Sequence, residues 1–303
     1  MKYKLLLCIT VLMLCVAARP IPKVISEGSI HTIENFESEF IAPRNVHVWL
    51  PDGYTVEKKY PVLYMHDGHM LFDPTNTWNK QEWGVDEVVS KLIKDGKVPP
   101  FIVVGIDSLD DTRYQEYFPE KAQVYAKNSS ESIPEAFLEI DFMADNYLQF
   151  LVKELKPFIK SKYSVSTKRE DTALMGSSMG GLISMYALSE YPNEFGKAAC
   201  ISTHFPGWVP EQSNGIGGSI VAYMSDNFPE AGNHKIYYDF GTEDLDSFYE
   251  PYQVLVDELM KTKGYTNSDW LTFKDEGAGH NEVSWNKRLH IPMTFLFQAK
   301  PKS

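Results

Sequence analysis

Cysteine is scarce in this chain of 303 residues, which contains three. Cys8 and Cys15 lie in an apolar N-terminal segment, so a mature chain without that segment keeps Cys200 alone and can form no internal disulfide. Cys200 lies in an apolar run that predicts a central strand, where a thiol is buried and unreactive. A disulfide-stapled fold is therefore excluded, and catalysis by a cysteine is disfavoured.

Positive charge is also in deficit, because 29 Lys and Arg face 41 Asp and Glu for a formal net charge of −12. No stretch gathers enough Lys and Arg to form the basic face that phosphate backbones require, so nucleic acid is not expected as a partner. The remaining composition, 43% hydrophobic and 23% charged, is ordinary for a globular protein, and the length suffices for a substantial core.

Long apolar runs are absent except at the N-terminus, so no membrane span is expected. The run from Leu5 to Ala18 follows two lysines and ends in small residues, which predicts a signal peptide over residues 1–18 with cleavage before Arg19. Cys15 raises the alternative of a lipoprotein, but the bulky Leu14 stands where a small residue is expected. Export is predicted, with periplasm, cell surface and medium as open destinations.

Strands alternate with helices along the rest of the chain. There is no internal repeat and no linker between two cores, so residues 19–303 are expected to form a single α/β domain with a mostly parallel sheet that begins with an antiparallel strand or hairpin. The predicted strands cover 45–50, 60–66, 101–107, 172–175, 198–202, 236–240 and 270–273. The predicted helices cover 83–94, 141–162, the segment after Gly180, 249–261, and a closing helix from about Asn281 that ends before Pro292.

Two long stretches, 108–140 and 203–234, show no regular periodicity and are expected to be irregular. Loops of that length in a compact domain are usually functional or mobile. Pro157 falls inside the predicted helix 141–162 and is expected to bend it.

The most informative stretch is Gly176-Ser177-Ser178-Met179-Gly180, a G-x-S-x-G motif between a short apolar strand and an apolar helix. In that context the motif predicts a nucleophile elbow, in which a strained turn exposes the central serine at a helix N-terminus. Gly176 and Gly180 supply the space that the turn needs, and Gly181 lets the helix pack close to the sheet. Ser178 is therefore the predicted nucleophile.

A serine hydroxyl needs a histidine base, and the base needs a carboxylate to orient it. In α/β-hydrolases both follow the serine in the chain, the acid before the histidine. His280 lies in a glycine-containing loop after the last predicted strand and is the predicted base. Asp244, after strand 236–240, is the predicted acid, with Glu243 and Asp246 beside it as alternatives.

The tetrahedral oxyanion formed during acyl transfer needs two backbone N–H donors. One is expected from Met179, which follows the nucleophile, and the other from His69, in the loop after strand 60–66. His66, Asp67 and His69 also suggest a metal site, but the spacing is short and no cysteine assists, so no metal is predicted.

Together these residues resemble the putative esterase (esterase D-like) family of α/β-hydrolases, closest in character to the feruloyl and acetylxylan esterases of carbohydrate esterase family 1. The resemblance covers nearly the whole mature chain. Besides the elbow it is carried by Val48–Tyr54, Tyr60–Gly68, Leu71–Asp73, Trp83–Glu87, Val104–Asp107, Arg113 with Glu116 and Tyr117, and Gly279–His280 with Trp285.

The resemblance implies an α/β-hydrolase fold with helices on both faces of the sheet, and a secreted serine carboxylesterase with Ser178, His280 and Asp244 as its triad. It also implies that His69 supports the oxyanion. His204 replaces a serine-rich segment of relatives and is expected to line the pocket, and Tyr117 and Trp208 are candidates for stacking on sugar or aryl rings.

An export signal favours a substrate outside the cytoplasm, and within this family an acylated plant polysaccharide such as xylan fits best. Feruloyl and acetyl groups are both open as the acid released. No metal or organic cofactor is implied. The alternatives are a siderophore trilactone esterase, an acyltransferase, and a catalytically silent binding protein on the same fold.

Overall fold

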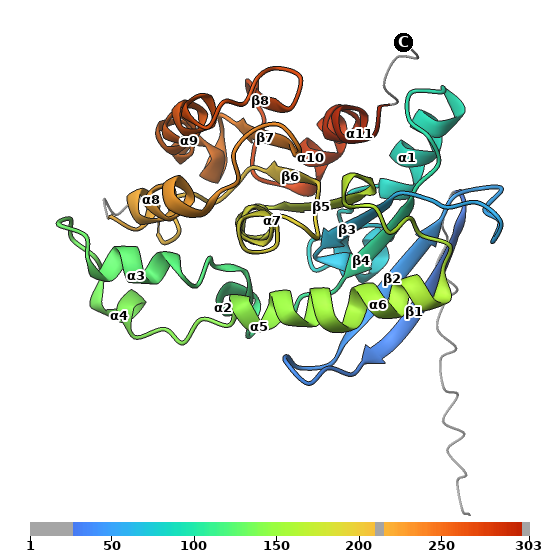
Figure 1. Cartoon of the computed structure of the whole chain (residues 1–303), viewed down its shortest axis with the longest axis horizontal. Helices are drawn as coiled ribbons and strands as arrows, with labels where there is room; N and C mark the ends of the chain where they lie inside the picture. Colours follow the sequence, from blue (N-terminus) through green and yellow to red (C-terminus); the bar gives the residue numbers. More distant parts are fainter. Residues whose placement is uncertain (1–26, 210–214, 299–303) are drawn as a thin grey trace, which may run out of the picture.

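The computed structural model describes residues 27–209 and 215–298, so the predicted signal peptide lies outside the described residues. In this part of the chain eight strands form one sheet in the order β1-β2-β4-β3-β5-β6-β7-β8 (Figure 1). β1 and β2 pair antiparallel at one edge, and the other strands are parallel to one another. The strands are β1 Ser29–Phe36, β2 Arg44–Leu50, β3 Val62–His66, β4 Ile102–Ile106, β5 Thr172–Ser177, β6 Lys197–Ile201, β7 Lys235–Gly241 and β8 Trp270–Asp275.

The central strands are buried on both faces, which explains their continuous apolar runs. In β3, Val62 and Tyr64 pack into one hydrophobic core, whereas Leu63 and Met65 pack into a second core on the opposite face. Figure 1 shows the two helical layers, with α1 and α11 on one side of the sheet and α5 to α9 on the other. The α/β-hydrolase fold predicted from the sequence is confirmed.

Helices cover both faces of this sheet. The innermost, α7, directly follows β5 and is buried at nearly every position, which explains why its sequence has no polar face. The helices are α1 Val85–Lys94, α2 Arg113–Tyr117, α3 Ala122–Lys127, α4 Glu135–Leu138, α5 Ala144–Gln149, α6 Lys156–Lys162, α7 Met179–Glu190, α8 Ile216–Asn227, α9 Glu250–Thr262, α10 Glu282–Arg288 and α11 His290–Phe297.

The expectation that residues 203–234 are irregular is wrong over α8. Gly217 and Gly218 lower the helix propensity of this segment. Burial overrides that cost, because Ile216, Ile220 and Tyr223 point into the core at helical spacing. Gly217 is also required there, since a Cβ would lie 2.2 Å from the Tyr252 ring. Short helices α2, α3 and α4 likewise interrupt the stretch 108–140.

Two predicted helices have different internal structure from that expected. The helix at 141–162 begins at Ala144, and a π-helical segment, Phe150–Leu155, precedes the turn that holds Pro157. The closing helix does not end before Pro292, because a separate helix, α11, begins at His290 and places Pro292 in its first turn. Proline is tolerated there because first-turn N–H groups have no acceptor within the helix.

The predicted site residues all follow the carboxyl ends of parallel strands. Asp67 and His69 follow β3, Ser178 follows β5, His204 follows β6, and His280 follows β8. Parallel strands end at one edge of the sheet, so the fold gathers these side chains there. Across the described residues, no helix combines the length and the apolar character that crossing a bilayer requires.

Candidate active site

Ser178 occupies a strained turn between β5 and α7. Its backbone has φ 58° and ψ −119°, a conformation that L-residues seldom adopt. Gly176 makes the turn possible, because a Cβ at that position would lie 2.7 Å from the carbonyl carbon of Gly180. A Cβ on Gly181 would lie 2.7 Å from Thr203 Oγ1, so α7 packs as closely as predicted. Ser178 is partly exposed at the helix N-terminus.

His280 is hydrogen-bonded to Asp246, not to Asp244. Its Nδ1 lies 2.6 Å from Asp246 Oδ1, and Asp246 is 1% exposed. The prediction that Asp244 orients His280 is therefore wrong. Glu243 and Asp244 are both exposed. Asp244 has a positive φ of 52°, and its carboxylate lies next to Gly279, in the loop that carries His280.

The Asp246 carboxylate is held by a buried polar network. Its Oδ2 accepts hydrogen bonds from Ser202 Oγ and the Gly241 N–H, each at 2.5 Å. Ser202 in turn accepts from Trp285 Nε1 at 3.0 Å and Arg288 Nη2 at 2.7 Å. Burial alone would raise the pKa of Asp246, but hydrogen bonding to His280 and Ser202 outweighs burial and holds the pKa below its usual range. Asp246 is therefore a charged, rigidly placed acceptor for His280.

The backbone N–H groups of Met179 and His69 each lie in the first turn of a helix. Met179 is the first residue of α7, and His69 lies in the single 3-10 turn Gly68–Met70 that follows β3. The first N–H groups of a helix have no acceptor within it. Gly68 brings this turn against the sheet, because a Cβ there would lie 2.6 Å from the Gly105 carbonyl carbon. The arrangement provides two backbone donors, but their role as the oxyanion hole stays a prediction.

Asp67 forms a two-point ion pair with Arg113, through Nε at 2.7 Å and Nη2 at 2.8 Å. Burial would raise the pKa of Asp67, but the Arg113 charge and hydrogen bonds outweigh it and hold the pKa at about 2. His66 Nδ1 is bonded to Tyr147 Oη at 2.8 Å. Within the described residues, no three His, Cys, Asp or Glu side chains are placed to hold a metal ion.

Tyr117 lies beneath this ion pair and has no exposed surface. The Arg113 guanidinium stands 5.2 Å from its ring centroid, and the His66 and Tyr147 rings pack on it at 5.3 and 5.2 Å. The prediction that Tyr117 contacts substrate is therefore wrong. Tyr117 supports Arg113 from the core.

His204 stands behind the site. Its Nε2 lies 2.9 Å from the Trp208 carbonyl oxygen, which can only accept, so Nε2 carries the proton and Nδ1 accepts from the Tyr249 hydroxyl at 2.8 Å. Tyr249 contacts the Ser178 side chain and packs edge-on against the His280 ring at 5.7 Å. Both His204 nitrogens are thus used inside the protein, and a contact between the half-buried His204 ring and substrate stays a prediction.

Trp208 is half-buried and packs against Tyr114 and Phe137, with ring centroids 6.1 and 5.9 Å apart. These contacts tie the segment after β6 to the short helices of 108–140. A contact between Trp208 and substrate stays a prediction.

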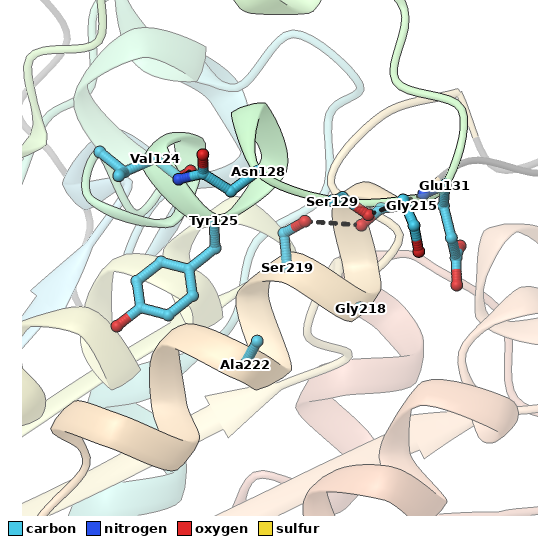
Figure 2. Close-up of a pocket in the computed structure, with 10 residues that line it drawn as sticks. Val124, Tyr125, Asn128, Ser129, Glu131, Gly215, Gly218, Ser219 and Ala222 are labelled. Atoms are coloured by element: carbon cyan, nitrogen blue, oxygen red, sulfur yellow. Dashed lines mark hydrogen bonds between the residues drawn. The ribbon is translucent and has the colours of Figure 1, made fainter.

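A cleft of about 430 Å³ opens over Ser178 and His280. The sequence did not point to several polar or aromatic residues on its walls, among them Trp78, Asn79 and Glu282, because nothing in the local pattern links residue 79 to residue 282. A larger hollow of about 570 Å³ lies between α3 and the start of α8 (Figure 2). Glu131 is the one titratable acid or base among its lining residues apart from the Tyr125 phenol, so no nucleophile with a base is assembled there.

The buried His66 and the half-buried His204 predict a pH dependence of stability. Burial lowers the pKa of His66 and of His204 to about 4, whereas histidine in an unfolded chain titrates near 6.5. As pH falls below 6.5 the unfolded chain takes up protons that the folded protein refuses until pH 4, so the free energy of unfolding decreases across that window. Each histidine should account for a loss of roughly 2 kcal/mol at about pH 5.

Urea unfolding at about pH 5 and about pH 7.5 measures this loss. His66→Gln and His204→Gln should each reduce the difference between the two pH values, whereas replacement of the exposed His290 by glutamine should leave it unchanged. If all three variants keep the wild-type difference in unfolding free energy between the two pH values, His66 and His204 do not cause the loss.

A serine on a strained strand-turn-helix and a buried carboxylate–histidine pair, at the carboxyl edge of a mostly parallel sheet, define a hydrolase of the α/β-hydrolase class. The chain belongs to the Esterase family, described as "Putative esterase", which matches residues 38–290. At that level it is a carboxylic ester hydrolase.

Several relatives cover most of the chain. It is 23% identical to the uncharacterized protein YbbA of Bacillus subtilis over 261 residues, which are 84% of this chain and 92% of that protein. It is 26% identical to an endo-1,4-beta-xylanase/feruloyl esterase of Xylanibacter ruminicola over 290 residues, which are 91% of this chain and 32% of that protein. The chain therefore spans about a third of that larger enzyme.

Solved structures share the fold. A ferulic acid esterase is 21% identical with a TM-score of 0.64, over 89% of this chain and 98% of the other. The enterobactin esterase FES from Shigella flexneri is 20% identical with a TM-score of 0.66, over 88% of this chain and 58% of the other.

Proposed function

We propose that Ser178, His280 and Asp246 form the catalytic triad of a serine carboxylesterase. The observation that carries the proposal is the 2.6 Å hydrogen bond from His280 Nδ1 to the buried Asp246, in the same cleft as the strained Ser178. Because Asp246 accepts a hydrogen bond from the Nδ1–H group, the proton of the neutral imidazole stays on Nδ1 and the lone pair of His280 is on Nε2, the atom that acts as base.

The proposed reaction has two halves. Ser178 Oγ attacks the ester carbonyl carbon while His280 Nε2 takes the hydroxyl proton, and the negative oxygen is bound by the N–H groups of Met179 and His69. Collapse breaks the ester C–O bond, and His280 gives its proton to the departing alcohol. Water then attacks the acyl-serine with His280 again as base, which releases the acid and restores Ser178.

For the substrate we propose an acylated plant polysaccharide, from which the exported enzyme removes feruloyl or acetyl groups. The similarity to a xylanase/feruloyl esterase over 91% of this chain supports this choice, as does the predicted signal peptide. The similarity to an enterobactin esterase keeps a siderophore trilactone as the second candidate. Both candidates require the same triad, so the triad alone does not decide between them.

Chromatography of the acids released from natively esterified xylan tests the substrate class. Wild-type protein should release ferulate or acetate, and Ser178→Ala should release neither. The identity of the acid assigns the acyl group. If wild type releases no acid from xylan but opens a catecholate trilactone, the polysaccharide proposal is wrong and the siderophore alternative replaces it.

A further inference from the structure

The cleft has two sides that receive different parts of an ester. His280 must protonate the departing alcohol, so the alcohol part lies against the His280 side. That side is built by the segment that follows His280 on the way into α10, and by the loop 77–83 across from it. The chemistry of these two segments therefore determines which alcohol the enzyme accepts.

Trp78 is the most exposed aromatic residue on this cleft, with 82% of its surface accessible. Its indole packs on no other ring among the described residues, whereas the neighbouring Trp83 and Trp285 are buried and stack on each other at 5.2 Å. A tryptophan buries a large apolar area when it finds a partner, so leaving one exposed gives up stability. An exposed indole at the mouth of an active-site cleft offers a flat surface to a ring of the substrate.

Beside Trp78 stands a polar pair from distant parts of the chain. Asn79 Nδ2 donates to Glu282 Oε2 at 2.6 Å, across 203 residues of sequence. Glu282 Oε1 has no hydrogen-bond partner among the described residues and is not sealed from solvent. Glu282 is 7% exposed and lines the cleft, so its accessible Oε1 can accept a hydrogen bond from a ligand hydroxyl group there.

The loop that carries Trp78 and Asn79 is anchored rather than free. Trp83 N–H donates to Met70 O at 3.0 Å, and Asn286 Nδ2 of α10 donates to Trp83 O at 2.7 Å. Thr77, directly before Trp78, is buried and bonds to Pro74 O at 3.0 Å. The loop backbone and the polar pair are thus held in place before a ligand arrives, which reduces the entropy cost of binding.

We propose that Trp78, Asn79 and Glu282 form a subsite for the sugar ring that carries the ester. The indole stacks on the C–H face of a neutral pyranose or furanose, and the Glu282 carboxylate and Asn79 amide bind its hydroxyl groups. A simple alkyl alcohol has no ring to stack on the indole and no second hydroxyl group for Glu282, so it would not use the subsite. This inference rests on the proposed function and names the alcohol part of its substrate.

Two esters with the same acyl group test the subsite: a monoacetylated methyl β-xylopyranoside and ethyl acetate. Trp78→Ala should lower kcat/KM for the sugar ester about tenfold, mainly through KM, because the lost stacking is made in the bound state and the transition state alike. The effect on ethyl acetate should stay below about twofold. Trp78→Phe should recover most of the loss, and Glu282→Gln should weaken the sugar ester selectively.

Val56→Ala is the matched control, because Val56 is an exposed apolar residue outside the residues that line the cleft. If Trp78→Ala lowers kcat/KM equally for both esters, or leaves kcat/KM for the sugar ester unchanged, the subsite proposal is wrong.

A binding measurement tests the subsite independently of ester hydrolysis. Ser178→Ala should bind xylotriose with quenching of tryptophan fluorescence, and Ser178→Ala/Trp78→Ala should not. Xylotriose binding without ester hydrolysis in wild type would contradict the proposed function alone.

Discussion

Replacing Ser178 by alanine should lower kcat for ester hydrolysis by at least about four orders of magnitude. The reason is chemical: without Oγ no acyl-enzyme forms, and only the oxyanion donors and substrate binding remain to accelerate attack by water. Folding should be nearly unchanged. Alanine at φ 58° carries the same backbone strain as serine, and the Ser178 side chain is partly exposed.

Hydrolysis of 4-nitrophenyl acetate, labelling by a fluorophosphonate and thermal unfolding together measure this effect. Wild type should label at one serine, Ser178→Ala should not label, and the melting temperatures should agree. Ser189→Ala, in the same helix, is the control, because Ser189 Oγ is buried and bonds to Met185 O. Retained turnover in Ser178→Ala with full stability would mean that the elbow is not the site of attack.

The second large effect is expected at Asp246. Asp246→Asn should lower kcat about ten-thousandfold, because an amide can present an N–H to His280 Nδ1 and so place the imidazole proton on Nε2, the atom that must act as base. The equivalent changes Asp244→Asn and Glu243→Gln should alter kcat by less than about threefold, since neither carboxylate reaches His280 in this structure.

The lowered pKa of Asp246 keeps this carboxylate ionised through the working range, so wild type should not lose activity through protonation of Asp246. Urea titrations correct the rates for the fraction folded. If Asp246→Asn kept the wild-type kcat and Asp244→Asn lost it, Asp244 and not Asp246 would be the triad acid.

The elbow and the proposed base could be predicted because their signals are local. A strand, a G-x-S-x-G turn and an apolar helix are adjacent in sequence, so the strain at Ser178 follows from Gly176 and Gly180. His280 was proposed from its place in a glycine-containing loop after the last strand. The alternation of apolar strands and helices determined the sheet for the same reason, since the apolar pattern within each element shows that the element is buried.

The choice of Asp246 could not be made from the sequence, because three carboxylates stand within four positions after β7. The carboxylate that turns inward is selected by the 3-10 turn Asp244–Phe248 and by two groups that donate hydrogen bonds to it, the Gly241 N–H and Ser202 Oγ. Tyr117 shows the same limit, since ring contacts from distant segments hold it in the interior.

The sequence by itself determined the class of fold and predicted the proposed nucleophile and base, because hydrophobic periodicity and turn chemistry act over a few neighbouring residues. The tertiary structure alone decided which carboxylate meets His280 and that Asn79 meets Glu282. Both contacts join residues far apart in the chain, and their energies depend on burial and on the orientation of donors, which exist only once the sheet is assembled.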